Sequence, residues 1–86
     1  MATLHCQILT PEGNAFDGEV AFVGAQALDG QVGILPRHAP LLTALGKGSL
    51  RVKLAGGEEK KWQIDGGFME VLNNEVSVVA ERLTEA

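Results

Sequence analysis

Glycine divides this chain into short segments. Eleven of the 86 residues are glycine, and they recur at short intervals from Gly13 to Gly67. Between them lie runs of about four to eight residues rich in valine, isoleucine, leucine and phenylalanine. Such a pattern is typical of strands joined by turns, because glycine adopts the backbone conformations that turns require. The sequence therefore predicts an all-β fold, a compact two-sheet β-sandwich of short strands.

Alternation of side chains supports this prediction in the second half of the chain. Leu50, Val52 and Leu54 alternate with polar and charged residues, as expected for a strand with one buried face. Residues 55–59 contain two adjacent glycines and predict a hairpin turn. Residues 60–65 are expected to form the returning strand.

The end of the chain continues the same pattern. Residues 68–72 predict a further strand, and Asn73 and Asn74 predict a turn because asparagine tolerates left-handed backbone angles. Residues 75–80 are nearly continuous in valine, as expected where both faces of a strand are covered. Helix signals are poor throughout. Residues 81–86 are expected to be either a tail or the start of a helical domain that is missing from residues 1–86.

Length and charge restrict the class of protein. Eighty-six residues make one domain, 1–86. The net charge is −4 and aromatic residues are few, so nucleic acid is not an expected partner. No apolar run approaches the roughly 20 residues of a membrane helix, so direct membrane insertion is not expected. Residues 37–61 nevertheless hold six of the seven lysines and arginines. This uneven charge is interpreted either as a means of orienting the protein against a partner or as the solvated ends of hairpins.

Few residues suggest chemistry. Metal ligation would have to use His5, His38, Cys6 and scattered carboxylates, which have no recognised ligand spacing, and no phosphate-binding glycine loop is present. Cys6 is expected to be a buried thiol, since Leu4, Cys6 and Ile8 share one face of a strand. We therefore predict no catalytic, cofactor-binding or metal site. An enzyme built around His38 and Cys6 stays as the weakest alternative.

Lys47 supports a different alternative. Swinging-arm carrier domains are small β-sandwiches that carry a modified lysine at a hairpin tip. Lys47 lies between Gly46 and Gly48, without the residues that usually surround such a lysine. A solvated turn lysine is the simpler interpretation, and a carrier domain modified at Lys47 is the alternative function.

The segment from Gly30 to Leu42 is unusually stiff for a connection. Pro36 and Pro40 fix their own φ angles and push the residues before them toward extended conformations. The segment is interpreted either as a rigid crossover between the two sheets or as a preformed contact surface for another protein. The two interpretations are compatible, because a stiff loop loses less entropy when it docks.

Three motifs together resemble one family. They are Leu9–Glu12 with Phe16–Gly18, then Gly33–Leu42 (GILPRHAPLL), then Asp65–Val71 (DGGFMEV). In this order and spacing they resemble the amino-terminal β-sandwich domain of the epsilon subunit of F-type ATP synthases, which is called delta in mitochondria. The resemblance spans most of residues 8–80.

The resemblance implies a non-catalytic, structural subunit of the central stalk, or rotor, that links ion flow to ATP synthesis. The implied partners are the gamma subunit and the c-ring, and the implied location is peripheral, on the cytoplasmic face of the bacterial inner membrane. Residues expected in the loop facing the c-ring are Asp29, Gly30 and Gln31. Residues expected on or near the gamma-facing surface are Thr10, His38 and Thr43. Residues expected to be structural are Gly33, Pro36, Pro40, Gly66, Gly67 and Phe68, with Phe68 or Met69 filling the core.

This sequence departs from the family pattern at several positions. Gln31 stands where an acidic residue is common, which puts a salt-bridge role there in doubt. Arg37 stands where glycine is usual, at a cost of roughly 1 kcal/mol or more if the position has a positive φ. Most members continue into two carboxy-terminal helices that inhibit ATP hydrolysis and in some members bind ATP, so neither activity is assigned to residues 1–86.

Overall fold

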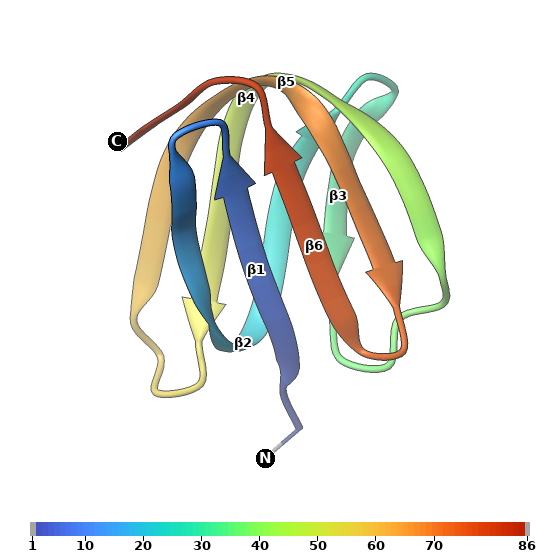
Figure 1. Cartoon of the computed structure of the whole chain (residues 1–86). Coiled ribbons are helices and arrows are strands. Elements are labelled where there is room, and N and C mark those ends of the chain that lie inside the picture. The colour runs from blue at the N-terminus through green and yellow to red at the C-terminus, as the bar shows by residue number, and fades with distance from the viewer. Residues whose placement is uncertain (1, 86) are drawn as a thin grey trace.

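The computed structural model describes residues 2–85, in which every regular element is a β-strand (Figure 1). The strands are β1 (Leu4–Thr10), β2 (Gly13–Ala27), β3 (Gly30–Ile34), β4 (Leu41–Leu54), β5 (Glu59–Leu72), β6 (Glu75–Ala80) and β7 (Leu83–Glu85). The all-β prediction is confirmed. Three strands are longer than predicted: β2 has 15 residues, and β4 and β5 have 14 each.

The long strands each contribute to two layers. Layer one contains β1 and β6, together with residues 13–20 of β2, 41–45 of β4 and 67–72 of β5. Layer two contains β3, β7 and the other halves of the same long strands. Hydrogen bonding runs through all seven strands, so the two layers are folded parts of one sheet. The predicted two-layer sandwich is present, with layers that are joined by the strands themselves.

A single apolar core fills the space between the layers. The buried residues come from every strand except β7, and no polar or charged residue among residues 2–85 is buried. Leu4, Cys6 and Ile8 point inward from β1 as predicted, and Cys6 has no exposed surface. Trp62 closes one side of the core, where its ring meets that of Phe16 edge to face at 5.9 Å.

Glycine allows β5 to pass from layer two to layer one without a break. Gly66 and Gly67 have φ angles of +85° and +137°, which side chains other than hydrogen rarely permit. A Cβ atom at Gly67 would overlap the carbonyl oxygen of Val79 on β6. This bend joins the two strands predicted at 60–65 and 68–72 into one.

Near the end of the chain the structure differs from the covered strand expected at residues 75–80 and from the helical alternative for residues 81–86. On β6, Val76 and Val78 are buried but Val79 is 45% exposed, so only one face of this strand is covered. Residues 83–85 form β7 and pair with residues 62–64 of β5, so residues 81–85 do not begin a helix. Leu83 packs against the core, and the free edge of layer two supplies the hydrogen-bonding partners. Residue 86 lies outside the described residues.

The turns predicted at residues 55–59 and at Asn73 and Asn74 are confirmed. Asn73 and Asn74 have φ angles of 51° and 64° and connect β5 to β6. The β4–β5 hairpin turns at residues 55–58. Residues 2–85 contain no helix of the length and apolar character needed to cross a lipid bilayer.

Gly67→Ala tests the close approach of β5 to β6. The substitution should destabilise the fold by about 3 kcal/mol or more, because both the positive φ and the contact with Val79 oppose a side chain. For a domain of this size, that loss lowers the thermal midpoint by more than about 12 °C. Gly56→Ala is the matched control, since a Cβ there meets nothing within 4 Å. Calorimetric midpoints that fall equally for the two variants would contradict this account of the bend.

Candidate functional site

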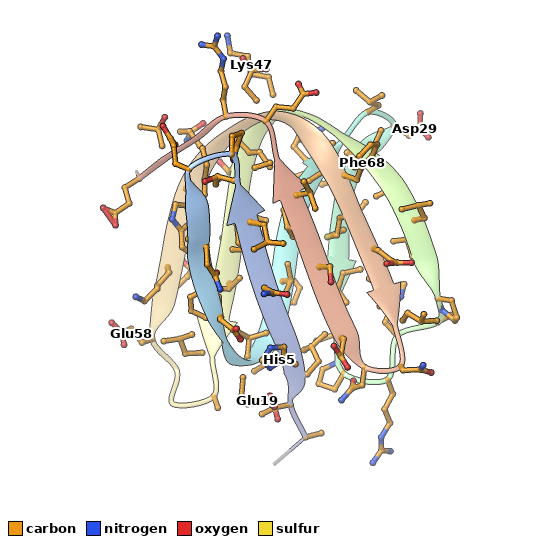
Figure 2. The ribbon with its side chains drawn as sticks, viewed as in Figure 1. His5, Glu19, Asp29, Lys47, Glu58 and Phe68 are labelled. Carbon is orange, nitrogen blue, oxygen red and sulfur yellow. The ribbon has the colours of Figure 1, made fainter. Side chains whose placement is uncertain are left out.

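The loop expected to face the c-ring is a tight hairpin between β2 and β3. Leu28 and Asp29 form the turn, Gly30 has a φ of +133°, and Gln31 pairs with Gln26. The amide of Leu28 donates a hydrogen bond to the carbonyl of Ala44, which ties the hairpin to β4. Figure 2 shows Asp29 at the end of the sandwich opposite Glu58, which lies in the β4–β5 hairpin. Asp29 and Leu28 therefore project from one tip of the molecule.

The three residues expected to face the gamma subunit do not form one cluster. Thr10 ends β1, where its hydroxyl donates to the carbonyl of Gly13. His38 lies in the loop between β3 and β4, which is tied to the start of β1 and therefore to the opposite end of that strand. Thr43 lies on β4, on the free edge of layer one. Thr10 and His38 are thus separated by about 20 Å, the length of β1.

The loop between β3 and β4 is held in place by a residue whose role the sequence did not reveal. The side chain of Asn74 accepts a hydrogen bond from the amide of Arg37 (2.9 Å) and donates one to the carbonyl of Thr3 (2.7 Å). The amide of His38 donates to the carbonyl of Leu35, closing a turn around Pro36. The loop joins β3 in layer two to β4 in layer one, so the predicted crossover is present, here between two layers of one sheet.

Arg37 occupies a position that favours glycine. Its φ is 68°, at the third residue of a turn whose second residue is Pro36, the geometry of a type II turn. Because φ is positive, arginine in place of glycine costs about 1 kcal/mol of folding stability at this position. Pro36 and the hydrogen bonds of Asn74 hold the backbone there despite that cost.

The other expected structural residues take different roles. Gly33 pairs with Gly24 on the outer face of layer two, where the ring of Phe22 covers both glycines. Of the two candidates for the core, Met69 is fully buried and Phe68 is 59% exposed. Phe68 points outward because it follows Gly67 directly, and strand alternation then places Met69 inside.

Phe68 belongs to an exposed apolar surface on layer one. The strand register places Ala44, Phe68, Val79 and Leu9 side by side across β4, β5, β6 and β1. Leu42 and Leu72 lie nearer the loop between β3 and β4 and are 71% and 47% exposed, and Glu70 stands between Phe68 and Leu72 on β5, opposite Leu42. Leu28, hydrogen-bonded to Ala44, continues the row into the hairpin of Asp29. We call this surface the layer-one face: Leu9, Leu28, Leu42, Ala44, Phe68, Leu72 and Val79.

Four apolar side chains side by side on the outer face of a sheet, from Ala44 to Leu9, are unusual for an isolated domain. Single exposed apolar residues are normal, whereas contiguous ones mark surfaces that another molecule covers. The outer face of layer two is different, since Gln31, Ser49, Arg51 and Lys61 lie there. The sandwich thus has two unlike faces. The apolar one was not predicted, because Phe68 or Met69 was expected to fill the core and both faces of residues 75–80 were expected to be covered.

Lys47 is not at a hairpin tip. It lies within β4, opposite Asp65 of β5, at the bend that Gly46 and Gly48 permit. Figure 2 shows its side chain projecting from the same end of the sandwich as Asp29. The prediction of a turn at Lys47 is wrong, and the geometry that suggested a carrier lysine is absent.

Cys6 and His38 do not come together. Cys6 points into the core from β1, and burial raises the pKa of its thiol to about 12. The thiolate is the reactive form of cysteine, so this group is inert near neutral pH. His38 lies outside in the loop between β3 and β4, where its ring nitrogen Nδ1 is 2.7 Å from the carbonyl of Ala39.

A polar cluster that the sequence analysis did not identify joins β1 and β2. His5 lies 2.7 Å from a carboxylate oxygen of Asp17 and 3.1 Å from one of Glu19, and Thr3 donates a hydrogen bond to Glu19. Figure 2 shows His5 and Glu19 close together. The hydrogen bond to Glu19 raises the pKa of His5, and the bonds from Thr3 and His5 lower the pKa of Glu19. The cross-strand register could have predicted the cluster only after the β1–β2 pairing was known.

This architecture is that of a β-sandwich domain with an exposed apolar face and a projecting hairpin, which is typical of a protein that binds partners through its outer surfaces. Residues 3–86 match the family model described as "ATP synthase, Delta/Epsilon chain, beta-sandwich domain". The chain therefore belongs to the delta/epsilon-chain family of ATP synthase, through its β-sandwich domain.

Proteins named "ATP synthase epsilon chain" are among its relatives. The one from Desulforamulus reducens is 48% identical over 84 residues, which cover 98% of this chain and 63% of the relative. The one from Psychrobacter arcticus is 38% identical over 86 residues, which cover 100% and 62%. The chain thus spans less than two thirds of the length of these relatives.

Solved structures share the fold. A chain in the mitochondrial ATP synthase of Euglena gracilis (OSCP/F1/c-ring) superposes with a TM-score of 0.92 at 22% identity, over 99% of this chain and 54% of that one. A chain from the central stalk and c-ring of the Tetrahymena thermophila enzyme gives a TM-score of 0.80 at 20% identity, over 94% and 65%. Because both sequence identities are below 25%, these two superpositions are evidence for a shared fold alone.

The cluster of His5 predicts a pH-dependent effect of Glu19→Gln. Because the pKa of His5 is raised above its ordinary 6.5, the stability from its charged contacts is present below pH 6.5 and is lost as pH rises through the higher, folded-state pKa. Because the pKa of Glu19 is lowered from 4.5, its stability is present above pH 4.5 and is lost as pH falls through the lower pKa. Glu19→Gln should therefore lower the thermal midpoint more at about pH 5.5 than at about pH 9. Glu70→Gln on β5 is the matched control, because it removes the same charge away from His5. An equal loss for Glu19→Gln at both pH values would contradict the pairing.

Proposed function

We propose that this chain is a non-catalytic subunit of the central stalk of an F-type ATP synthase, with the gamma subunit and the c-ring as its partners. In this role it turns with the rotor and supports the coupling of ion flow to ATP synthesis. It is a peripheral part of the complex, on the cytoplasmic face of the bacterial inner membrane. Family membership and the names of the relatives support this assignment.

The observation that carries the proposal is the exposed layer-one face. Phe68 and Val79 are neighbours across β5 and β6, and both stand out from a sheet whose other side is the core. A partner that covers them gains the free energy of removing apolar surface from water, about 25 cal/mol per Å². Aromatic side chains near the centre of an interface commonly contribute most of the binding energy. We therefore assign the layer-one face to the gamma subunit.

The residues expected to face the gamma subunit fit the margins of this surface. Thr43 lies between Leu42 and Ala44 on the edge strand β4, with its side chain on the opposite side of the strand from theirs, and His38 lies in the loop that leads into β4. Thr10 lies at the far end of β1, beyond Leu9. An interface of standard size, about 1,200–2,000 Å² in total, is large enough to reach all three residues. A single small contact could not reach all three residues.

The hairpin of Asp29, Gly30 and Gln31 is assigned to the c-ring. It projects from one tip of the sandwich and is continuous with the layer-one face through Leu28. A subunit held by its face thus presents this tip to a second partner. Asp29 supplies the negative charge of the hairpin, since Gln31 is neutral.

Phe68→Asp tests the assignment of the face. Titration calorimetry against purified gamma subunit should show one-to-one binding by the unaltered chain and about 30-fold or more weaker binding by the variant, the cost of losing a central aromatic contact. Gln63→Asp is the matched control, because Gln63 is also exposed on β5 but belongs to layer two. Equal affinities for Phe68→Asp and the unaltered chain would exclude this face as the interface.

Cysteine cross-linking tests the assignment of the hairpin. Asp29→Cys should form a cross-link with the c-ring in the assembled complex, whereas Glu58→Cys, at the opposite end of the sandwich, should not (Figure 2). The native Cys6 does not compete, because it is buried and its pKa is raised to about 12. Cross-linking from Glu58→Cys instead of Asp29→Cys would mean that the sandwich is mounted the other way round.

A further inference from the structure

The outer face of layer two carries two like charges in direct opposition. Arg51 on β4 pairs with Lys61 on β5, and Gly24 and Gly33 continue the same row on the other side of Arg51. Like charges that face each other across strands repel and destabilise a sheet. The ion pairs found in residues 2–85 are both made by His5, so no carboxylate lies within ion-pair distance of Arg51 or Lys61.

Arg51 is held in place by what lies beneath it. Its guanidinium carbon is 5.7 Å from the centroid of the Phe22 ring, within range of a cation–π interaction. The ring and the arginine lie close over glycine: a Cβ at Gly24 would be 3.0 Å from Phe22 and 3.1 Å from Arg51 Nε. Gly33 provides a second close contact for the ring. The arginine is therefore positioned by packing, which lowers the entropy lost when it binds a ligand.

A shallow depression adjoins this pair of cations. Its volume is about 210 Å³, and it is lined by Ala25, Gln31, Ser49, Arg51 and Lys61. Four of these five side chains can donate hydrogen bonds, and none is a carboxylate. Since a water molecule occupies about 30 Å³, the depression has room for a small oxyanion and several waters.

We propose that this depression binds a phosphoryl group, presented by a soluble phosphate compound or by the headgroup of an anionic lipid. The guanidinium of Arg51 matches two phosphate oxygens at once, and Lys61 supplies a second positive charge. Ser49 and Gln31 donate to the remaining oxygens. Binding relieves the repulsion between Arg51 and Lys61, which accounts for two unneutralised cations facing each other. The proposal does not depend on the assignment of the layer-one face.

The charges around the depression favour a small anion over an extended acidic protein segment. Lys53, the next outward-facing residue on β4, stands opposite Glu59, so the positive charge is interrupted there. Gln63 stands opposite Ser49 on the other side of the pair, and neither carries charge. The unbalanced positive charge is thus confined to the neighbourhood of Arg51 and Lys61.

The test is a nuclear magnetic resonance titration of the isotopically labelled chain with inorganic phosphate at low ionic strength. Saturable shifts are expected for the amides of Gln31, Ser49, Arg51 and Lys61. The double variant Arg51→Gln/Lys61→Gln should bind at least about tenfold more weakly, because both charged contacts are lost. The control Lys47→Gln/Lys53→Gln removes the same net charge outside the depression and should stay within about twofold. Shifts that do not saturate, or that weaken equally in both double variants, would overturn the proposal.

A thermal melt shows whether each variant folds. Without phosphate, Lys61→Gln should not lower the midpoint, since it removes a repulsion. Phosphate should raise the midpoint of the unaltered chain and leave that of Arg51→Gln/Lys61→Gln unchanged.

Two further arms identify the source of the phosphoryl group. Co-sedimentation with phosphatidylcholine vesicles that contain phosphatidic acid, lost in Arg51→Gln/Lys61→Gln and absent with phosphatidylcholine alone, would support the lipid headgroup. Saturable binding of inorganic phosphate without such co-sedimentation would support a soluble compound. Binding of polyglutamate without binding of phosphate would overturn the proposal in favour of an acidic protein partner.

Discussion

The close approach of Gly67 to the backbone of Val79 is the contact on which the rest of the structure depends. It lets β5 turn from layer two into layer one while keeping its hydrogen bonds to β4 and β6. The turn also sets the register of the next residues, so that Met69 enters the core and Phe68 stands outside. A shift of one residue would exchange them, because side chains alternate along a strand. The burial of Met69 and the exposure of Phe68 thus follow from the same bend at Gly67.

The sequence predicted the parts of this fold that local chemistry controls. Alternation at Leu50, Val52 and Leu54, and the turn at Asn73 and Asn74, are properties of neighbouring residues, and the structure agrees with them. The length of β5 was not predictable in the same way, because two glycines usually end a strand and here they bend one. β7 was also missed, since its pairing with β5 depends on a free sheet edge that no local pattern reveals.

The candidate surfaces were harder to predict than the fold. Family resemblance pointed to the hairpin of Asp29 and to the margins of the layer-one face, but not to its centre. The resemblance made Phe68 a structural residue and left open whether Phe68 or Met69 fills the core. Asn74 looked like a turn residue only, although its side chain also holds the loop at Arg37. Both roles depend on residues brought together from distant parts of the chain.

Hydroxyl-radical footprinting of the chain, free and bound to the gamma subunit, tests the central claim most directly. The claim is that the layer-one face is apolar because a partner covers it. Phe68 lies on this face, and Phe22 lies over glycines on the outer face of layer two, so the chain contains its own internal control. The account predicts that binding protects Phe68 from oxidation and leaves Phe22 unchanged. Protection of Phe22 with continued oxidation of Phe68 would contradict it.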